Sequence, residues 1–246
     1  VTLEVNGEEY GIHTDRYGQS VALGSAPPVS IDNPAMTWTS VDIPCQQATL
    51  GAEGVIYGLC EGAALKAGFP TEQRAAEIEE FVATYAPFEA ETAAGVLSFQ
   101  GQGSTEATET ERRQIAEWAR LTAVEASTGR QSVELGLAML WRREGGVAGF
   151  CDDLLIYSTG QVRSYTCGGE TIEPTGQGRL TTEDLALLYV WLDTFPQTMV
   201  EQTDDAEADA MTLQMLLVGR NPQAEQATEE QQQEMMAFAQ EQFDSV

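Results

Sequence analysis

Basic side chains are scarce in this chain. Its 246 residues include 12 Lys and Arg against 39 Asp and Glu, which gives a formal net charge of −27, and Lys66 is the only lysine. A chain with this balance repels nucleic-acid phosphates and anionic membrane surfaces. We therefore expect no nucleic-acid partner. The acidity predicts either a highly soluble surface or attraction to a cationic or metal-bearing partner.

Histidine is almost absent, and long apolar runs are absent altogether. His13 is the single histidine, which excludes a two-histidine zinc site within one chain. A Ser-His-acid triad would have to use this residue, which lies in a polar, turn-rich stretch. No phosphate loop of the GxxxxGK(S/T) type occurs, and no run of about 18 apolar residues is present, so we expect no transmembrane segment. These absences predict a protein that is not an enzyme and that holds no cofactor and no metal.

Cysteine is sparse too, but its four positions are informative. Cys45 and Cys60 are 15 residues apart, and Cys151 and Cys167 are 16 apart. These spacings do not fit zinc ribbons or thioredoxin-type sites. In an antiparallel hairpin, the numbers of two facing residues have a constant sum, which is 105 for the first pair and 318 for the second. Each pair can therefore bracket one hairpin.

The turns that these sums predict agree with the local sequence. The first turn centres on residues 52–53 between two glycines, and the second is the loop 158–160, in which Gly160 takes the left-handed position. Facing residues lie about 5 Å apart at Cα, within reach of an S–S bond. We predict that both cysteine pairs form disulfides; four buried free thiols are the alternative. Two structural disulfides predict an extracytoplasmic location, which means the periplasm, the cell surface or the medium.

The predicted elements occur in the same order in both halves of the chain. After a hairpin around Asn6-Gly7 and a loop at 17–36, the first half has a strand at 36–43, the cysteine hairpin, a helix from Thr71, a strand at 95–100 and a helix from Thr108. After a linker at 127–132, the second half has a strand at 133–143, the cysteine hairpin, a helix from Thr181, a strand at 211–218 and a helix from Thr228. The predicted inner faces of the helices are Ala75, Ile78, Val82 and Tyr85; Ile115, Trp118 and Ala119; Leu185, Leu188, Leu192 and Phe195; and Met235, Phe238, Ala239 and Phe243.

Matching residues of the two halves differ in number by an offset that only increases along the chain. The offset is 106 or 107 for the cysteines, 110 for the first helix, 118 for Gly101 and Gly219, and 120 for the second helix. A few insertions in loops explain all of these values. We predict an α+β fold of two tandem homologous modules, residues 1–128 with the extra N-terminal hairpin and residues 129–246. Each module is predicted to have a small antiparallel sheet with a cysteine-bridged hairpin and two helices.

A glycine-rich run distinguishes the second module. Residues 142–150 read RREGGVAGF, with three glycines in five residues. Such a run permits close approach of another backbone or a sharp turn, and the alternative is a strand connection or bulge. By the offset of the cysteines, the first module has Ser40–Pro44 in place of Gly146–Phe150 and lacks the glycines.

The stretch 140–150, LWRREGGVAGF, resembles the N-terminal strand of emfourin-like proteins, which typically reads R-x-G-G-apolar-A-G. The following order is also similar: Leu180-Thr181 opening a Leu-rich helix, paired strands ending near Gly219, and a C-terminal helix. Emfourin is a proteinaceous inhibitor of thermolysin-like zinc metalloproteases. The resemblance covers residues 140–243 and implies a protein partner, specifically a thermolysin-like protease.

The resemblance also implies which residues contact that partner: Arg143, Gly145, Gly146, Val147, Ala148, Gly149 and Phe150. The glycines would let the main chain pair with an edge strand of the enzyme. Phe150 would fill an apolar pocket or, alternatively, join the core. Asp152 or Asp153 would approach the catalytic metal or, alternatively, form a solvated strand end.

The prediction for function is a secreted protein-binding module that inhibits a metalloprotease by presenting Gly145–Phe150. The first alternative is a non-catalytic structural or surface-assembly protein built from the duplicated module. The second is an acid/base hydrolase, because 39 carboxylates leave room for a catalytic pair. Four acids between Asp204 and Asp209 are interpreted as a solvated loop, with calcium binding as the alternative.

Overall fold

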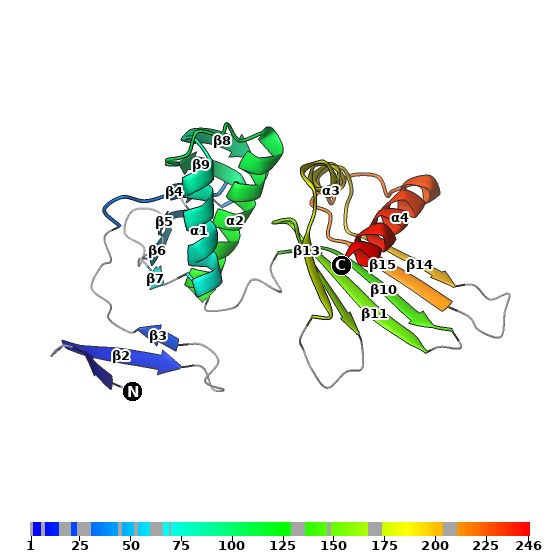
Figure 1. Ribbon diagram of the computed structural model, residues 1–246, viewed down its shortest axis with the longest axis horizontal. Helices are drawn as coiled ribbons and strands as arrows, with labels where there is room; N and C mark the ends of the chain where they lie inside the picture. Colours follow the sequence, from blue (N-terminus) through cyan, green and yellow to red (C-terminus); the bar gives the residue numbers. More distant parts are fainter. Residues whose placement is uncertain are drawn as a thin grey trace. The chain divides into compact units, whose positions relative to one another are not determined.

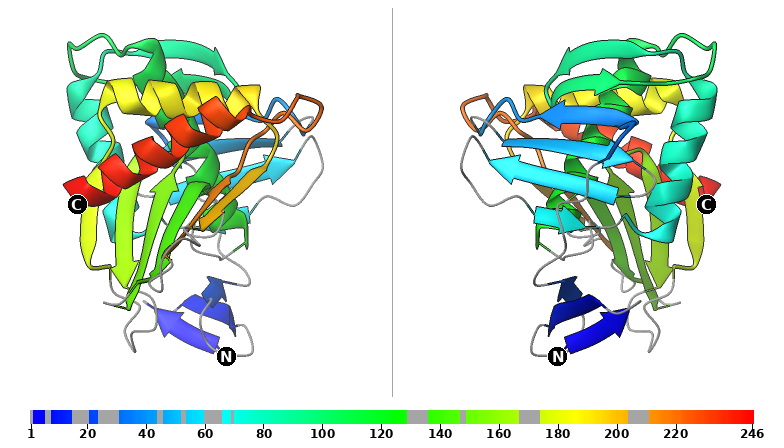
Figure 2. Two further views of the ribbon diagram at one scale, coloured as in Figure 1. Left: turned by 90° about the vertical axis from the view of Figure 1, so that its right-hand side faces the viewer. Right: turned by 90° about the vertical axis from the view of Figure 1, so that its left-hand side faces the viewer.

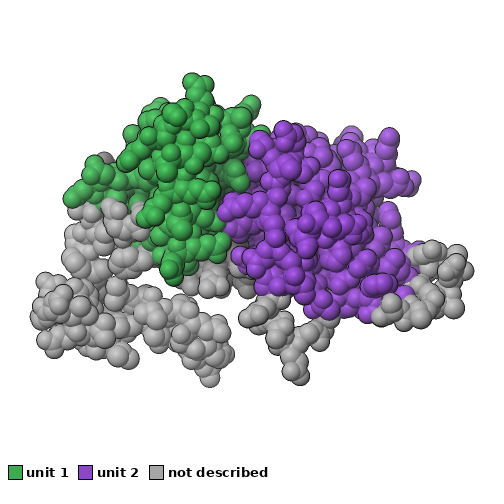
Figure 3. Space-filling model, viewed as in Figure 1, with its two compact units in different colours: residues 1–135 green, residues 136–246 purple. Residues whose placement is uncertain are grey.

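The computed structural model divides into two compact units, the first unit (residues 1–135) and the second unit (residues 136–246) (Figure 3). The structure describes residues 2–5, 8–14, 21–23, 31–43, 46–51, 54–59, 66–68, 70–128, 136–146, 149–166, 174–203 and 211–246. These residues contain four helices, two six-stranded antiparallel sheets and one three-stranded sheet. The predicted α+β class is therefore confirmed.

The first unit begins with the small sheet and continues with one of the large ones (Figure 1). Its elements are β1 (Thr2–Val5), β2 (Glu8–Thr14), β3 (Val21–Leu23), β4 (Met36–Thr39), β5 (Gln46–Gly51), β6 (Gly54–Leu59), β7 (Lys66–Gly68), α1 (Glu72–Thr84), β8 (Phe88–Thr92), β9 (Gly95–Phe99) and α2 (Glu109–Thr128). Val5 faces Glu8, so the N-terminal hairpin has the predicted two-residue connection. The prediction of a loop at 17–36 is wrong at Val21–Leu23, which pairs with β2.

The second unit contains the other large sheet and two helices. Its elements are β10 (Leu137–Gly145), β11 (Phe150–Tyr157), β12 (Gln161–Thr166), β13 (Gly176–Arg179), α3 (Thr182–Thr194), β14 (Thr198–Thr203), β15 (Met211–Leu217) and α4 (Glu229–Ser245). Both helices lie on the same face of the sheet (Figure 2). Their core partners on the sheet include Met139, Trp141 and Met215, all at most 1% exposed.

The two large sheets have the same strand order. The first unit has β7-β6-β5-β4-β9-β8, and the second has β13-β12-β11-β10-β15-β14. The central tryptophans occupy the same place, because Trp38 faces Ala48 and Leu97, and Trp141 faces Leu154 and Met215. The two units therefore share their topology, strand by strand.

The helices begin at matching threonines. The hydroxyl of Thr71, Thr108, Thr181 or Thr228 accepts a hydrogen bond from the backbone N–H three residues later. In α2 and α4 the third residue, Glu111 or Gln231, also accepts from the threonine N–H at 2.8 and 2.9 Å. Both helices thus begin with a capping box at the predicted threonine, and the box satisfies N–H groups that a helix start leaves open.

Each pair of helices is joined by one edge-to-face aromatic contact. Phe81 and Trp118 have ring centroids 5.8 Å apart at 89°, and Trp191 and Phe238 are 5.1 Å apart at 89°. These residues match by the helix offsets of 110 and 120, with phenyl and indole exchanged. The predicted inner face of α1 missed Phe81, and its Ala75 and Val82 are only partly buried.

One glycine follows β9 in the first unit and another follows β15 in the second. Each lets the chain pass close to the end of a helix. A Cβ on Gly101 would lie 2.0 Å from the carbonyl oxygen of Tyr85, and a Cβ on Gly219 would lie 2.1 Å from that of Phe195. Tyr85 and Phe195 are the C-caps of α1 and α3. No other residue type fits there without a backbone shift.

Several strands and one boundary were not predicted from the pattern. The short strands β7, β8, β13 and β14 are all at or next to an edge of a sheet, and their sequences are rich in Glu, Gly, Gln and Thr. Apolar alternation is weak in such strands because they cover little core. The predicted linker is also wrong at residues 127–128, which belong to α2; residues 129–132 lie outside the described part.

Candidate functional site

The glycine run forms the turn of the hairpin that joins β10 and β11. Gly145 faces Phe150 in the last pair of the ladder, and the N–H of Gly149 donates to the carbonyl oxygen of Gly146 at 2.9 Å. Of the seven predicted contact residues, Val147 and Ala148 lie outside the described residues. The other five are brought together at this hairpin end.

The three glycines are explained by the backbone of the turn. Gly145, Gly146 and Gly149 have φ angles of 107°, 73° and 65°, a region that residues with a Cβ adopt rarely. The glycine run thus forms a hydrogen-bonded turn between two strands. This is the strand connection that the sequence offers as the alternative to a close approach of another backbone. Space is not the constraint at Gly149, since a Cβ there would meet nothing within 4 Å.

Arg143 organises the side chains of the hairpin end on the face that carries the helices. Its guanidinium carbon lies 4.5 Å from the ring centroid of Phe150 and 5.1 Å from that of Phe243 in α4. Its Nη2 and Nε donate to one oxygen of Asp152 at 2.5 and 3.1 Å. Stacking of an arginine on aromatic rings contributes about 0.5–2 kcal/mol per contact, more when water is excluded.

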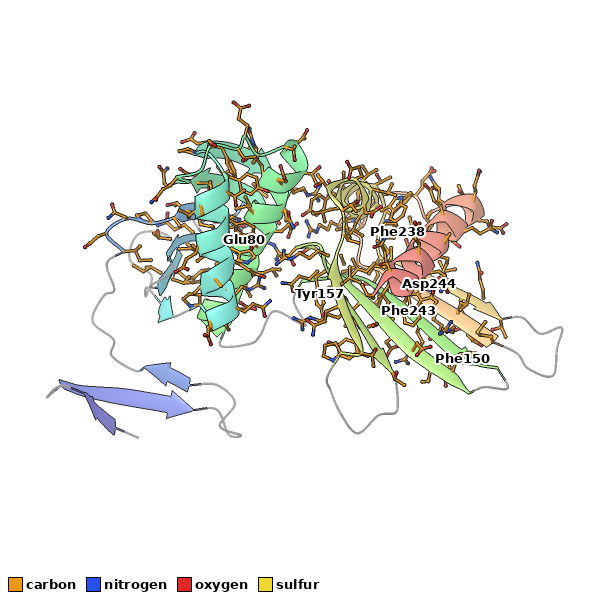
Figure 4. The ribbon with its side chains drawn as sticks, in the orientation of Figure 1. Glu80, Phe150, Tyr157, Phe238, Phe243 and Asp244 are labelled. Atoms are coloured by element: carbon orange, nitrogen blue, oxygen red, sulfur yellow. The ribbon has the colours of Figure 1, made fainter. Side chains whose placement is uncertain are left out.

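This cluster is continuous with the core of the second unit. Phe243 also contacts Trp141, with ring centroids 5.2 Å apart. The order from core to solvent is Trp141, Phe243, Arg143 and Phe150. Phe150 at the outer end is 44% exposed, and Figure 4 shows it at the tip of the hairpin, with Phe243 on the helix. Phe150 is therefore not a core residue. Its ring is exposed, and the contact with Arg143 holds it in place.

A second arginine stiffens the opposite face of the same hairpin. Arg142 faces Asp153 across the ladder and donates to both carboxylate oxygens, at 2.6 and 2.9 Å. Its hydrogen bond to Asp153 raises the pKa of Arg142 above the usual arginine value, although partial burial opposes this. Asp152 and Asp153, the two aspartates predicted as alternatives for contact with a metal, are thus both paired with arginines. The pair of Asp153 with Arg142 is bidentate.

Only one of the four cysteines lies within the described residues. Cys151 is in β11, faces Glu144 and is disulfide-bonded. Cys45, Cys60 and Cys167 lie outside the described residues. The ladders next to them have the predicted register: Gln46 faces Leu59, with a sum of 105, and Asp152 faces Thr166, with a sum of 318.

The matching hairpin of the first unit is shorter, and its described residues, 36–43 and 46–51, form no such cluster. Trp38 and its facing residue are ten positions apart, whereas Trp141 and Leu154 are thirteen apart. In the first unit the last backbone contact before the turn is Ser40 N–H to Gln46 oxygen, at 2.8 Å. The second unit adds two facing pairs, Glu144 with Cys151 and Gly145 with Phe150. The extra length is thus located at the hairpin end itself.

Sequence reasoning missed the two partners that hold the predicted contact residues in place. Asp152 was considered only as a metal contact or a strand end, and Phe243 was assigned to the inner face of a helix. The alternation of Trp141 and Arg143 in one strand indicates that both point to one face. No signal in the sequence shows that a residue 100 positions later in the chain completes that face.

Comparison with known proteins gave no match: no family model, no curated protein and no solved structure matches the chain. The emfourin-like resemblance therefore stays a prediction. Within the described residues, no helix is long and apolar enough to cross a membrane, and no group of three or more His, Cys, Asp or Glu is placed to hold a metal ion. The acidic cluster at 204–209 lies outside the described residues.

Proposed function

We propose that the protein is an extracytoplasmic, non-catalytic protein-binding module whose second unit presents the hairpin end to a protein partner. The observation that supports this most is the exposed Phe150 ring, which stacks on Arg143, an arginine that also stacks on Phe243. A recognition residue that is ordered before binding loses little conformational entropy in the complex. Exposed aromatic residues with buried bases are typical of binding hot spots.

The specific form of the proposal is inhibition of a thermolysin-like metalloprotease, as the resemblance to emfourin-like proteins implies. The turn has glycines at 145, 146 and 149, which let another backbone approach closely. Both hairpin strands are cross-linked by arginine–aspartate pairs, so the end is stiff. A stiff end resists being drawn into a productive, cleavable conformation.

We also propose that the two units arose by duplication of one module. The shared strand order, the matching threonine caps, the exchanged aromatic pairs and the matching close glycines support a common origin. The first unit then serves as a natural comparison for the second, because it has the same scaffold without the glycine turn.

Inhibition is tested by titrating a thermolysin-like protease with the protein. Wild type is expected to remove activity stoichiometrically, and Phe150→Ala is expected to weaken inhibition by about 30-fold, the effect of a hot-spot residue worth about 2 kcal/mol. Val190→Ala is the matched control, because Val190 is 58% exposed on α3 and outside the hairpin end.

Unchanged activity with several such proteases would rule out the inhibitor form of the proposal. An equal loss of inhibition in Phe150→Ala and Val190→Ala would rule out the hairpin end as the contact with the protease. Concentration-dependent filaments or large oligomers in sedimentation, together with absent inhibition, would favour a structural or surface-assembly protein instead.

The pairing of Cys45 with Cys60 and of Cys151 with Cys167 is also a proposal. The facing neighbours Gln46 with Leu59 and Asp152 with Thr166 support it. Alkylation without reduction is expected to add no mass, and peptide mapping of the non-reduced protein is expected to link each pair within its own hairpin. A linked peptide that joins the two hairpins would contradict the pairing.

A further inference from the structure

The face of the second-unit sheet opposite α3 and α4 has a row of aliphatic side chains. Successive side chains of a strand point to opposite faces, and Met139 and Trp141 are in the core with the helices. Leu140 between them therefore points to the opposite face. So do its facing residues in the neighbouring strands.

The ladder register aligns four such residues across four adjacent strands. Leu155 of β11 faces Leu140 of β10, Leu140 faces Leu216 of β15, and Leu216 faces Met199 of β14. The three leucines are partly buried, and Met199 is 75% exposed, the most exposed of the large apolar side chains in the described residues. We call these four residues the aliphatic row.

The first unit has polar side chains at every matching position. Thr49 faces Thr37, Thr37 faces Ser98, and Ser98 faces Glu89 in the corresponding strands β5, β4, β9 and β8. Thr37 precedes Trp38 as Leu140 precedes Trp141, so the two rows are equivalent. The scaffold thus does not need an apolar row here. Something particular to the second unit accounts for it.

Charge and size favour one kind of occupant. The second unit has 19 Asp and Glu against five arginines. The two successive rows between the aliphatic row and the hairpin end have Asp153, Glu144 and Glu201 against the single base Arg142. Arg142 is paired with Asp153. Arg163 of β12 faces Leu155 at the end of the aliphatic row, and its guanidinium carbon lies 5.7 Å from the ring centroid of Tyr157. Two copies of a chain with a net charge of −27 repel each other. A cationic partner is attracted.

The dimensions of the row suit a single helix rather than a globular surface. Adjacent strands are about 4.8 Å apart and a helix rises about 5.4 Å per turn, so a helix that follows the row places one apolar side chain per strand. Four side chains, three of them partly buried, offer much less than the roughly 800 Å² per partner of a standard protein interface.

We propose that the aliphatic row is a docking surface for a cationic amphipathic helix of another protein. The leucines and Met199 contact the apolar face of that helix, and Glu144 and Glu201 lie beside its Lys or Arg side chains. This surface is separate from the hairpin end, which uses the other face of the same sheet. The two surfaces can therefore be altered independently.

The test uses a Leu/Lys peptide of about 14 residues with leucine once per helical turn. A peptide of the same composition in scrambled order is the control. Binding to the full chain is measured by fluorescence anisotropy at about 0.15 M salt, where long-range attraction is screened. Wild type is expected to bind the amphipathic peptide at least about tenfold more tightly than the scrambled one, because only the former aligns apolar side chains with the row.

Two charge-neutral variants isolate the row. Leu140→Thr/Leu216→Ser introduces the residues of the first unit and is expected to remove that preference. Met199→Gln changes a mostly exposed residue, retains the fold and is expected to weaken binding about threefold. Thermal unfolding verifies that both variants are folded. Phe150→Ala is expected to leave peptide binding unchanged, which separates this proposal from the one for the hairpin end.

Equal binding of both peptides, or equal binding by wild type and the row variants, would overturn the proposal. A dimer in sedimentation that disappears in the row variants would identify a second copy as the occupant and would overturn it as well. So would row-dependent binding to zwitterionic vesicles in place of the peptide.

Discussion

Gly219→Ala is expected to destabilise the second unit by about 3 kcal/mol or more, which is at the upper end for a single methyl group. The added Cβ would lie 2.1 Å from the carbonyl oxygen of Phe195 and 2.4 Å from that of Pro196. Both obstacles are backbone, so neither can move aside by changing rotamer. The free energy of unfolding from denaturant titration measures the effect.

Gly149→Ala is the matched control for this substitution. Gly149 has a positive φ but no atom within 4 Å of an added Cβ, so only the backbone preference is lost, about 1 kcal/mol. Gly101→Ala in the first unit is expected to resemble Gly219→Ala, because its Cβ would lie 2.0 Å from the oxygen of Tyr85. Similar small effects at Gly219 and Gly149 would show that the chain can shift at the helix end.

Glu77→Leu is expected to destabilise the first unit by about 3–5 kcal/mol, the range for breaking a buried ion pair from one side. Glu77 is 5% exposed, and its Oε2 accepts from Arg74 Nη1 at 3.0 Å and from the indole N–H of Trp118 at 2.5 Å. Without the carboxylate, the 7% exposed Arg74 loses its shorter ion pair, and the contact with Glu125 is longer, at 3.4 Å. Denaturant unfolding of the full chain, followed by tryptophan fluorescence, measures the loss.

The double variant Arg74→Met/Glu77→Leu is expected to recover at least half of that loss. The reason is that the double variant removes both buried charges of the Arg74–Glu77 pair, whereas Glu77→Leu leaves the arginine buried without this carboxylate. The second unit has an apolar residue, Leu187, at the position of Glu77, and it has Asp184 at that of Arg74. A double variant less stable than Glu77→Leu would show that Arg74 has a role independent of the pair.

This network also illustrates where the sequence was informative and where it was not. Apolar periodicity predicted four helices and most of their buried residues, such as Leu188 and Ile115. It placed the buried face of α1 wrongly because Arg74 and Glu77 are buried there as a pair, and a pattern of apolar residues gives no weight to charged ones. The threonines at the helix starts and the register of the two cysteine hairpins were predicted more reliably, because both depend on local geometry alone.

The candidate site was predicted only in part, for a related reason. The glycine run, Arg143 and Phe150 are contiguous in the sequence, so a local motif identified them. The stack that fixes Phe150 depends on Phe243, which reaches the hairpin only through the packing of α4 on β10. The aliphatic row was missed entirely, because its four members come from strands whose register only the sheet reveals.

The longer hairpin of the second unit has a consequence for protein engineering. Two added facing pairs extend the strands by about 7 Å, and the added residues of β10 pair on their other side with β15, where Glu144 faces Thr212 and Gly145 faces Met211. The added pairs lie beyond the buried Trp141 and contribute no residue to the core of the second unit. The shorter hairpin of the first unit likewise extends beyond a buried tryptophan, Trp38, as far as Ser40 and Gln46. Both ends are suitable places to graft foreign recognition loops, so one chain offers two display sites of different reach.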